Sequence, residues 1–239
     1  MLGTIGTAPY PTSEIHVWLA SLTVNPATTA RLGSDLSDEE RQRASRFHFD
    51  RDRNRYITGR GILRTILAQY LELHPTEIEI RTGDHGKPQL CSDRPGRLDF
   101  NVSHSEDIAV IAVGWDRNIG VDVEKVRLDI DYEEVARSFF SANETEALKR
   151  LSTEGTAEAF FSCWTRKEAY VKAIGCGLYL PLDSFDVSVE PGTPARFLRG
   201  VDARWQIVSF LAQRGYPAAL VYDGSPADVR FVAVDPQSI

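Results

Sequence analysis

The sequence has few cysteines and no long apolar run, and each shortage excludes a class of protein. Cys91, Cys163 and Cys176 are odd in number and scattered along the chain. They fit neither a disulfide framework nor a zinc motif, so they favour a reducing, cytoplasmic location. No window approaches the length of a membrane-spanning helix, so no membrane span is expected. The first residues (MLGTIGTAPYPTSE) lack the basic and apolar regions of a secretory signal, so no signal peptide is expected either.

The sequence also has fewer basic residues than acidic ones. Asp and Glu number 34 against 27 Lys and Arg, which gives a net charge of −7. A globally acidic protein is poorly suited to nonspecific binding of nucleic acid, and it can bind a phosphate-rich ligand only through a local cluster of bases. The chain has 239 residues, of which 42% are hydrophobic. That is enough for one large or two small soluble domains with a real core.

Helix signals occur in both halves of the chain. The segments 37–40 (SDEE) and 141–144 (SANE) have the serine and glutamate spacing of a helix-capping box. Apolar periodicity predicts longer helices over 53–71 and 157–174, the second with Thr156 as its N-cap.

Strand signals follow the helices in each half. Alternating or continuous apolar residues predict strands over 77–81, 97–103, 108–113 and 119–124, and in the C-terminal segments SFDVSV, RWQIVSF, AALVY and RFVAV. The repeated order, helices first and strands after, favours a duplicated α+β unit with a cleft between the copies.

The segment 119–124 (IGVDVE) carries the sharpest local signal. Because side chains alternate along a strand, Ile119, Val121 and Val123 are expected to face a core. Asp122 and Glu124 then share the other face, with Gly120 leaving open space beside them. Two carboxylates this close repel each other unless a cation lies between them, and Mg²⁺ prefers such an open cage of oxygen ligands. An ordinary solvated strand face is the alternative.

Four other segments could carry chemistry, and each also has an ordinary structural interpretation. Glu168 and Lys172 lie one helical turn apart, either facing a metal-bound pyrophosphate or forming a routine surface pair. Segments 101–105 (NVSHS) and 84–88 (DHGKP) could contact phosphate or nucleotide, or could simply be turns. The arginines between 41 and 60 could line a phosphate pocket or be solvated.

Taken together, these segments resemble one known family. GVDVE followed by FSCWTRKEAYVKAIGCGL closely resembles the signature pair of the Sfp-type phosphopantetheinyl transferases, a G-[IV]-D-x-E strand and a W-[ST]-x-K-E-[AS]-x-x-K helix. GRGILR, HGKPQL, FNVSHS and LPLDSF also look like family segments. The resemblance spans residues 36–187, and such a two-part signature is specific.

The resemblance implies a fold. It is an α+β fold of two similar halves related by a pseudo-twofold axis, with coenzyme A bound between them. We expect an N-terminal half over 1–118 on the adenine and 3′-phosphate side of coenzyme A. The C-terminal half, 119–239, is expected on the Mg²⁺ and pyrophosphate side.

The resemblance also implies roles for individual residues. The metal ligands would be Asp122, Glu124 and Glu168, and the catalytic residues Glu168 and Lys172. The coenzyme A contacts would be Arg43, Arg55, His85, Gly86, Lys87, Pro88, Ser103, His104 and Lys172. One departure is visible: some members carry a lysine where this chain has Glu40, which we assign to the helix cap. Glu144 is likewise assigned to a cap.

The implied reaction is Mg²⁺-dependent transfer of the phosphopantetheine arm of coenzyme A to a serine of an apo acyl or peptidyl carrier protein, with release of 3′,5′-ADP. Fatty-acid, polyketide or nonribosomal peptide synthesis could use it, and Mn²⁺ could replace Mg²⁺. The general base would be Glu168 or a metal-bound water. A duplicated chain forms its cleft internally, so a monomer is expected.

Two other classes of function stay open at this point. A carrier-binding module without catalysis could use the same fold, although it would not need a metal cage. A Mg²⁺-dependent phosphotransferase or hydrolase acting on nucleotides is the other, although no GxxxxGK[ST] or HExxH motif is present.

Overall fold

The structure, a computed structural model, describes residues 13–239 apart from 84–85, 92–95, 152 and 191. The first half contains β1 (Glu14–Ser21), α1 (Pro26–Ser34), α2 (Asp38–Ala44), α3 (Asp50–Leu71), β2 (Ile80–Thr82), β3 (Pro88–Leu90), β4 (Leu98–Ser105) and β5 (Ile108–Trp115). The second contains β6 (Ile119–Val123), α4 (Tyr132–Phe139), α5 (Ala142–Lys149), α6 (Thr153–Ile174), β7 (Asp186–Val187), β8 (Phe197–Arg199), β9 (Trp205–Gln213), β10 (Tyr216–Asp223) and β11 (Asp228–Val234).

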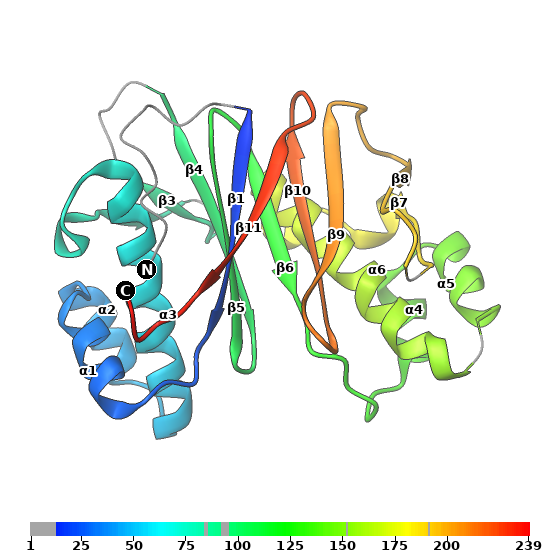
Figure 1. The fold of residues 1–239 in the computed structure, drawn as a ribbon. Coiled ribbons are helices and arrows are strands. Elements are labelled where there is room, and N and C mark those ends of the chain that lie inside the picture. The colour runs from blue at the N-terminus through cyan, green and yellow to red at the C-terminus, as the bar shows by residue number, and fades with distance from the viewer. Residues whose placement is uncertain (1–12, 84–85, 92–95, 152, 191) are drawn as a thin grey trace.

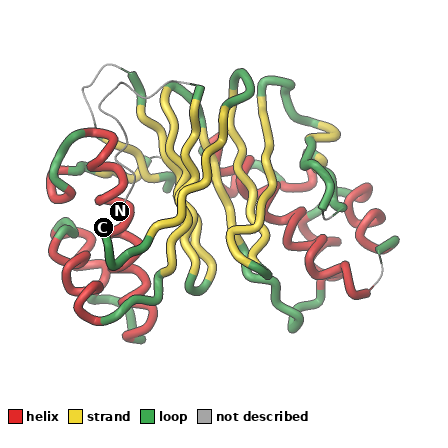
Figure 2. Tube along the Cα trace, viewed as in Figure 1, coloured by secondary structure: helices red, strands yellow, loops and turns green. Residues whose placement is uncertain are grey.

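Two sheets lie side by side at the centre of the molecule. Their strand orders are β11-β1-β5-β4 and β6-β10-β9. Helices α1 to α3 cover the outer side of the first sheet and α4 to α6 that of the second, so the strands are enclosed between two groups of helices (Figures 1 and 2). The apolar faces of both sheets meet in a core that includes Val17, Val110, Val121 and Leu220. The predicted α+β fold is confirmed.

The last strand crosses from one half to the other. β11 pairs in parallel with β1, from Glu14 opposite Asp228 to Ala20 opposite Val234. A division at residue 118 places β11 in the second half, whereas its hydrogen bonds place it in the first sheet. Among the described residues, no helix is long and apolar enough to cross a membrane.

Two local predictions were wrong. Residues 75–77 form a 3₁₀ helix and the following strand begins only at Ile80, so the alternation over 77–81 does not form one strand. α6 begins at Thr153, so Thr156 lies inside the helix instead of capping it. A threonine can occupy the first turns of a helix when the residues before it are also helical, and here the helix continues through Gly155.

Each half contains a buried ion pair between a capping-box glutamate and a basic residue of its long helix. This correspondence supports the duplication inferred from the sequence. The capping-box glutamate of α2, Glu40, accepts a hydrogen bond from Arg64 of α3 at 2.6 Å. Arg64 also donates to the backbone oxygens of Pro75 and Ile78, after that helix. Its cation therefore ties the short helix, the long helix and the segment after it together.

The second half repeats this arrangement with a lysine. Glu144, the capping-box glutamate of α5, pairs with Lys167 of α6 at 2.8 Å. Lys167 also donates to the backbone oxygens of Leu182 and Phe185 at 2.7 and 2.6 Å. The assignment of both glutamates to helix caps is confirmed.

We expect Lys167→Met to destabilise the protein strongly. The side chains of Lys167 and Glu144 are 0% and 2% exposed, so the variant leaves a buried carboxylate without its cation, which typically costs about 3–5 kcal/mol. Denaturant unfolding measures the loss. Adding Glu144→Gln should recover part of it, and Lys149→Met on the exposed face of α5 should change stability by less than about 0.5 kcal/mol. A loss below about 1 kcal/mol in the single variant would contradict this account.

Candidate active site at the junction of the two sheets

Side chains, and not a backbone ladder, join β4 to β6. These strands belong to different sheets. Alternate side chains of β4 accept hydrogen bonds from backbone amides twenty positions later: Asp99 from Ile119 (3.0 Å), Asn101 from Val121 (2.8 Å), Ser103 from Val123 (3.4 Å) and Ser105 from Lys125 (3.0 Å). Because strand side chains alternate, every second residue of β4 faces β6. We call these four residues the side-chain ladder.

Two members of the ladder also donate to the predicted metal ligands. Ser103 donates to Asp122 at 2.8 Å, and Ser105 donates to Glu124 at 2.9 Å. Lys172 of α6 reaches the same place, with its Nζ 2.5 Å from Asp122 Oδ1 and 3.1 Å from Ser103 Oγ. Asp122 is only 3% exposed, so the interpretation of a solvated strand face is wrong for this residue.

Gly120 sets how closely β6 approaches α6, the helix that carries Glu168 and Lys172. A Cβ at this position would lie 2.1 Å from the oxygen of Ala169 and 2.3 Å from the nitrogen of Ala173. The prediction that Gly120 leaves open space is therefore wrong, because the helix backbone fills that space. The other predicted face is confirmed: Ile119, Val121 and Val123 are fully buried.

Two carboxylates at this junction, Glu124 and Glu168, have raised pKa values. Burial raises the pKa of Glu168, and repulsion from Asp122 raises it further, while Lys172 opposes both. Burial and the charge of Asp122 likewise raise the pKa of Glu124. Such a group of mutually repelling acids is stabilised by additional positive charge.

His104 lies next to the ladder on β4, and the nearby cations Lys172 and Arg55 affect the pKa of its imidazole. Burial lowers its pKa, and the positive charges of Lys172 and Arg55 lower it further. The imidazole is therefore held toward its neutral form, in which one ring nitrogen donates and the other accepts.

The residues present fit a divalent cation, although they do not form a closed cage. Asp122 Oδ2 is buried and has no hydrogen-bond partner among the residues that the structure describes, which is costly for a carboxylate oxygen unless something else binds it. Within the described ranges, no group of three His, Cys, Asp or Glu residues is close enough to hold a metal. Mg²⁺ usually takes only one or two protein carboxylates and completes its shell with water and substrate phosphate, so an open site suits it.

The remaining predicted contacts lie at several places. Arg55 of α3 donates to Asp107 of the β4–β5 turn at 2.8 Å. Lys87 donates to Asp99 of the ladder at 3.2 Å and to the oxygen of Ile119 at 2.8 Å. Gly86 and Pro88 flank Lys87, Gly86 with a φ of +86° and Pro88 at the start of β3. His85 lies outside the described residues.

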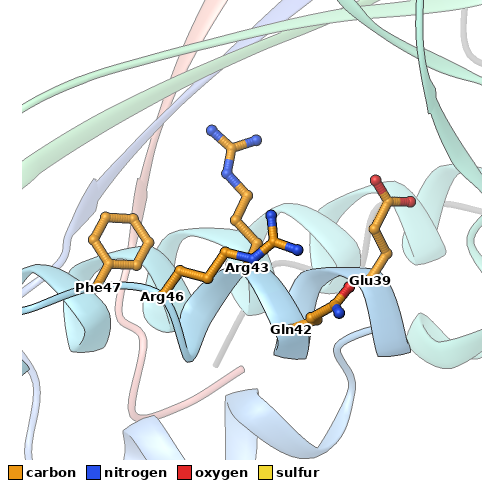
Figure 3. A pocket seen from close by; sticks show the side chains of 5 residues that line it. All are labelled: Glu39, Gln42, Arg43, Arg46 and Phe47. Carbon is orange, nitrogen blue, oxygen red and sulfur yellow. The ribbon is translucent and has the colours of Figure 1, made fainter.

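Arg43 lies on α2 in a concavity of about 550 Å³. Figure 3 shows its lining: Glu39, Gln42, Arg43, Arg46 and Phe47. The Arg43 guanidinium also lies 5.5 Å from the centre of the Tyr56 ring. Arg46 belongs to the basic segment that was expected to contain phosphate-binding arginines, and its position beside Arg43 makes it the second arginine of this concavity.

Comparison with known proteins decides the family. Residues 118–221 match the model of the 4′-phosphopantetheinyl transferase superfamily, and residues 25–115 match that of the 4′-phosphopantetheinyl transferase N-terminal region. The 4′-phosphopantetheinyl transferase HetI of Nostoc sp. is 37% identical over 213 residues, which cover 88% of each chain. The chain belongs to the 4′-phosphopantetheinyl transferase superfamily.

Two further relatives agree. The 4′-phosphopantetheinyl transferase Sfp of Bacillus subtilis is 30% identical over 86% of this chain and 91% of its own. A phosphopantetheinyl transferase of Thraustochytrium sp. is 34% identical over 76% of this chain and 69% of its own. The family and the transferase activity predicted from the motifs are therefore confirmed.

Sequence reasoning assigned no individual role to Ser105, Asp99 or Lys167. A signal for the first two was present, because Asp99, Asn101 and Ser103 alternate with apolar residues along β4 and Ser105 continues the same period. The segment 101–105 was considered as a phosphate contact, and its contact with β6 was not predicted. The contacts of Lys167 were not predicted, because a lysine in a helix is usually solvated, although the quoted helix motif has a lysine at this position.

We expect Gly120→Ala to push β6 away from α6. The added Cβ would collide with helix backbone, which cannot rotate away as a side chain can, so the free energy of unfolding should fall by about 1–3 kcal/mol or more. Transferase activity should fall further than stability alone explains, because Asp122 and Glu168 move apart. Gly59→Ala is the matched control. Its Cβ would only reach Leu22 Cδ2 at 3.4 Å, so we expect unchanged activity and slightly higher stability. Full activity in Gly120→Ala would contradict this account of the site.

Proposed function

We propose that this transferase moves the phosphopantetheine arm of coenzyme A to a serine of an apo acyl or peptidyl carrier protein and releases 3′,5′-ADP. The observation that carries the proposal is the convergence of Asp122, Lys172 and the β4 segment 103–105 at one junction, in a chain whose family is established. A buried acidic group beside a lysine suits the binding of a cation and a pyrophosphate together.

Asp122, Glu124 and Glu168 are proposed to hold Mg²⁺, with Mn²⁺ as a substitute. The metal would supply a Lewis acid for the pyrophosphate oxygens during transfer. The unpartnered Oδ2 of Asp122 and the raised pKa values of Glu124 and Glu168 support this assignment. These acids are better stabilised with a divalent cation among them than with Lys172 alone.

Lys172 and Glu168 are the proposed catalytic residues. The Lys172 ammonium, which contacts Asp122, would bind the coenzyme A phosphates. Glu168 would accept the proton of the carrier serine, directly or through a water, as that oxygen attacks the β-phosphorus. Because a carboxylate bound to a metal is less basic, transfer through a metal-bound water is the alternative route.

The coenzyme A contacts are proposed on both sides of this junction. Arg55, Ser103 and His104 would bind phosphate, and the electrostatic coupling of His104 to Arg55 and Lys172 supports a shared anion site. His85, Gly86, Lys87 and Pro88 would contact the adenine side. Arg43 would approach the 3′-phosphate, with Arg46 beside it in the same concavity.

The two halves are proposed to divide this work, with residues 1–118 on the nucleotide side and 119–239 on the metal and pyrophosphate side. A monomer suffices, because residues of one chain form the whole junction. Three unpaired cysteines support a reducing, cytoplasmic location.

Intact-protein mass spectrometry of an apo carrier protein tests the proposal. After incubation with the enzyme, coenzyme A and Mg²⁺, the carrier should gain the mass of one phosphopantetheine group. Glu168→Gln should slow this gain by at least about 100-fold, because the variant loses a metal ligand and a base. Glu158→Gln, an exposed glutamate of the same helix, is the matched control and should leave the rate unchanged.

Two results would contradict the proposal. Release of 3′,5′-ADP without a change in carrier mass would indicate a coenzyme A hydrolase. Binding of coenzyme A without reaction across several apo carriers would indicate a binding module.

A further inference from the structure

Ser105 makes two hydrogen bonds whose directions are fixed by chemistry. Its Oγ lies 3.0 Å from the amide nitrogen of Lys125 and 2.9 Å from Glu124 Oε2. The amide can only donate, so the hydroxyl oxygen accepts there. Its single proton is then free to be donated to the Glu124 carboxylate. One hydroxyl therefore links the backbone after β6 to the side chain of a proposed metal ligand.

The turn that carries Ser105 is held from the first half of the molecule. Asp107 Oδ1 accepts hydrogen bonds from Thr23 and Arg55, both at 2.8 Å, and the Asp107 backbone oxygen accepts one from Leu22 at 2.7 Å. Burial alone would raise the pKa of Asp107, but the bonds from Thr23 and Arg55 lower it below its usual value. The ionised Asp107 carboxylate therefore anchors the turn to the segments that carry Thr23 and Arg55.

The same turn is held from the second half. Lys125 donates its side chain to Glu106 at 2.6 Å in addition to donating its amide to Ser105. Ser105 thus lies in a segment bound on both sides, and its hydroxyl has little freedom to turn away from Glu124.

The position of the Glu124 carboxylate depends on its serine partner more than the position of the Asp122 carboxylate does. Asp122 Oδ1 accepts from both Ser103 and Lys172. Among the described residues, Ser105 is the one hydrogen-bond donor to the Glu124 carboxylate. A glutamate has three rotatable side-chain bonds, so a single bond at its end decides whether the carboxylate stays in place.

We propose that Ser105 is a positioning residue for the metal site: it holds Glu124 Oε2 so that the other carboxylate oxygen is directed to the divalent cation. This inference rests on the proposed metal site. Loss of a hydrogen bond to a metal-binding side chain typically weakens metal affinity or activity by about 10–100-fold, and the same range is expected here.

Direct binding of Mn²⁺ tests the role of Ser105 without relying on activity. Free Mn²⁺ is measured by electron paramagnetic resonance during titration of the protein, for the wild type, Ser105→Val and Ser105→Thr. The two variants differ only in a methyl group replacing the hydroxyl. Ser105→Val should raise the dissociation constant by about 10–100-fold, and Ser105→Thr should restore most of the affinity.

Asn101→Ala separates positioning from damage to the side-chain ladder. Asn101 belongs to the same ladder and donates to neither Asp122 nor Glu124. Its loss should lower the melting temperature, because the Val121 amide loses its acceptor, and leave Mn²⁺ affinity near that of the wild type. The Mg²⁺ concentration for half-maximal transfer should follow the same order as the Mn²⁺ dissociation constants.

Three results would overturn the inference. Equal Mn²⁺ affinity in the wild type and Ser105→Val would show that the hydroxyl does not position a ligand. Equal weakening in Asn101→Ala and Ser105→Val would assign the effect to the ladder as a whole. If the wild type itself binds no Mn²⁺, the proposed metal site fails, and the role of Ser105 fails with it.

Discussion

The site depends on one constraint: alternate side chains of β4 accept hydrogen bonds from backbone amides of β6 and of Lys125 just after it. They join two sheets that share no backbone pairing. The spacing of twenty residues is constant along the contact, so the two strands keep one register from Asp99 to Ser105. The same contacts that hold the halves together therefore place Asp122 beside Ser103 and Glu124 beside Ser105. A shift by one residue would turn each of these side chains to the other face.

The duplicated ion pairs explain how each half keeps its long helix in place. Arg64 and Lys167 perform the same structural task, but only in the second half does the next residue belong to the site. Successive helix positions point about 100° apart, since a turn takes about 3.6 residues. Lys167 can thus be buried in its own half while Glu168 is directed toward β6. The anchor of the helix and its proposed metal ligand are neighbours in sequence with separate tasks.

Electrostatics at the junction leave the three carboxylates unequally compensated. The Lys172 ammonium pairs with Asp122. Glu124 and Glu168 are left with raised pKa values, because burial and the Asp122 charge act on both. Three carboxylates therefore gather at the junction, while Arg43, Arg55 and Lys87 lie on the first half.

The sequence by itself determined the family, the fold class and the residues of the junction. Short-range alternation on β6 was enough to assign Val121 and Asp122 to opposite faces, and helical spacing placed Glu168 and Lys172 on one face. What the tertiary structure decided were contacts between distant segments. Lys172 lies on Asp122, Gly120 is pressed against α6, β11 joins the first sheet, and Ser105 holds Glu124. Periodicity reports only which way a side chain points from its own strand or helix. The partner it meets there depends on how the two halves pack, and no local pattern encodes that distance.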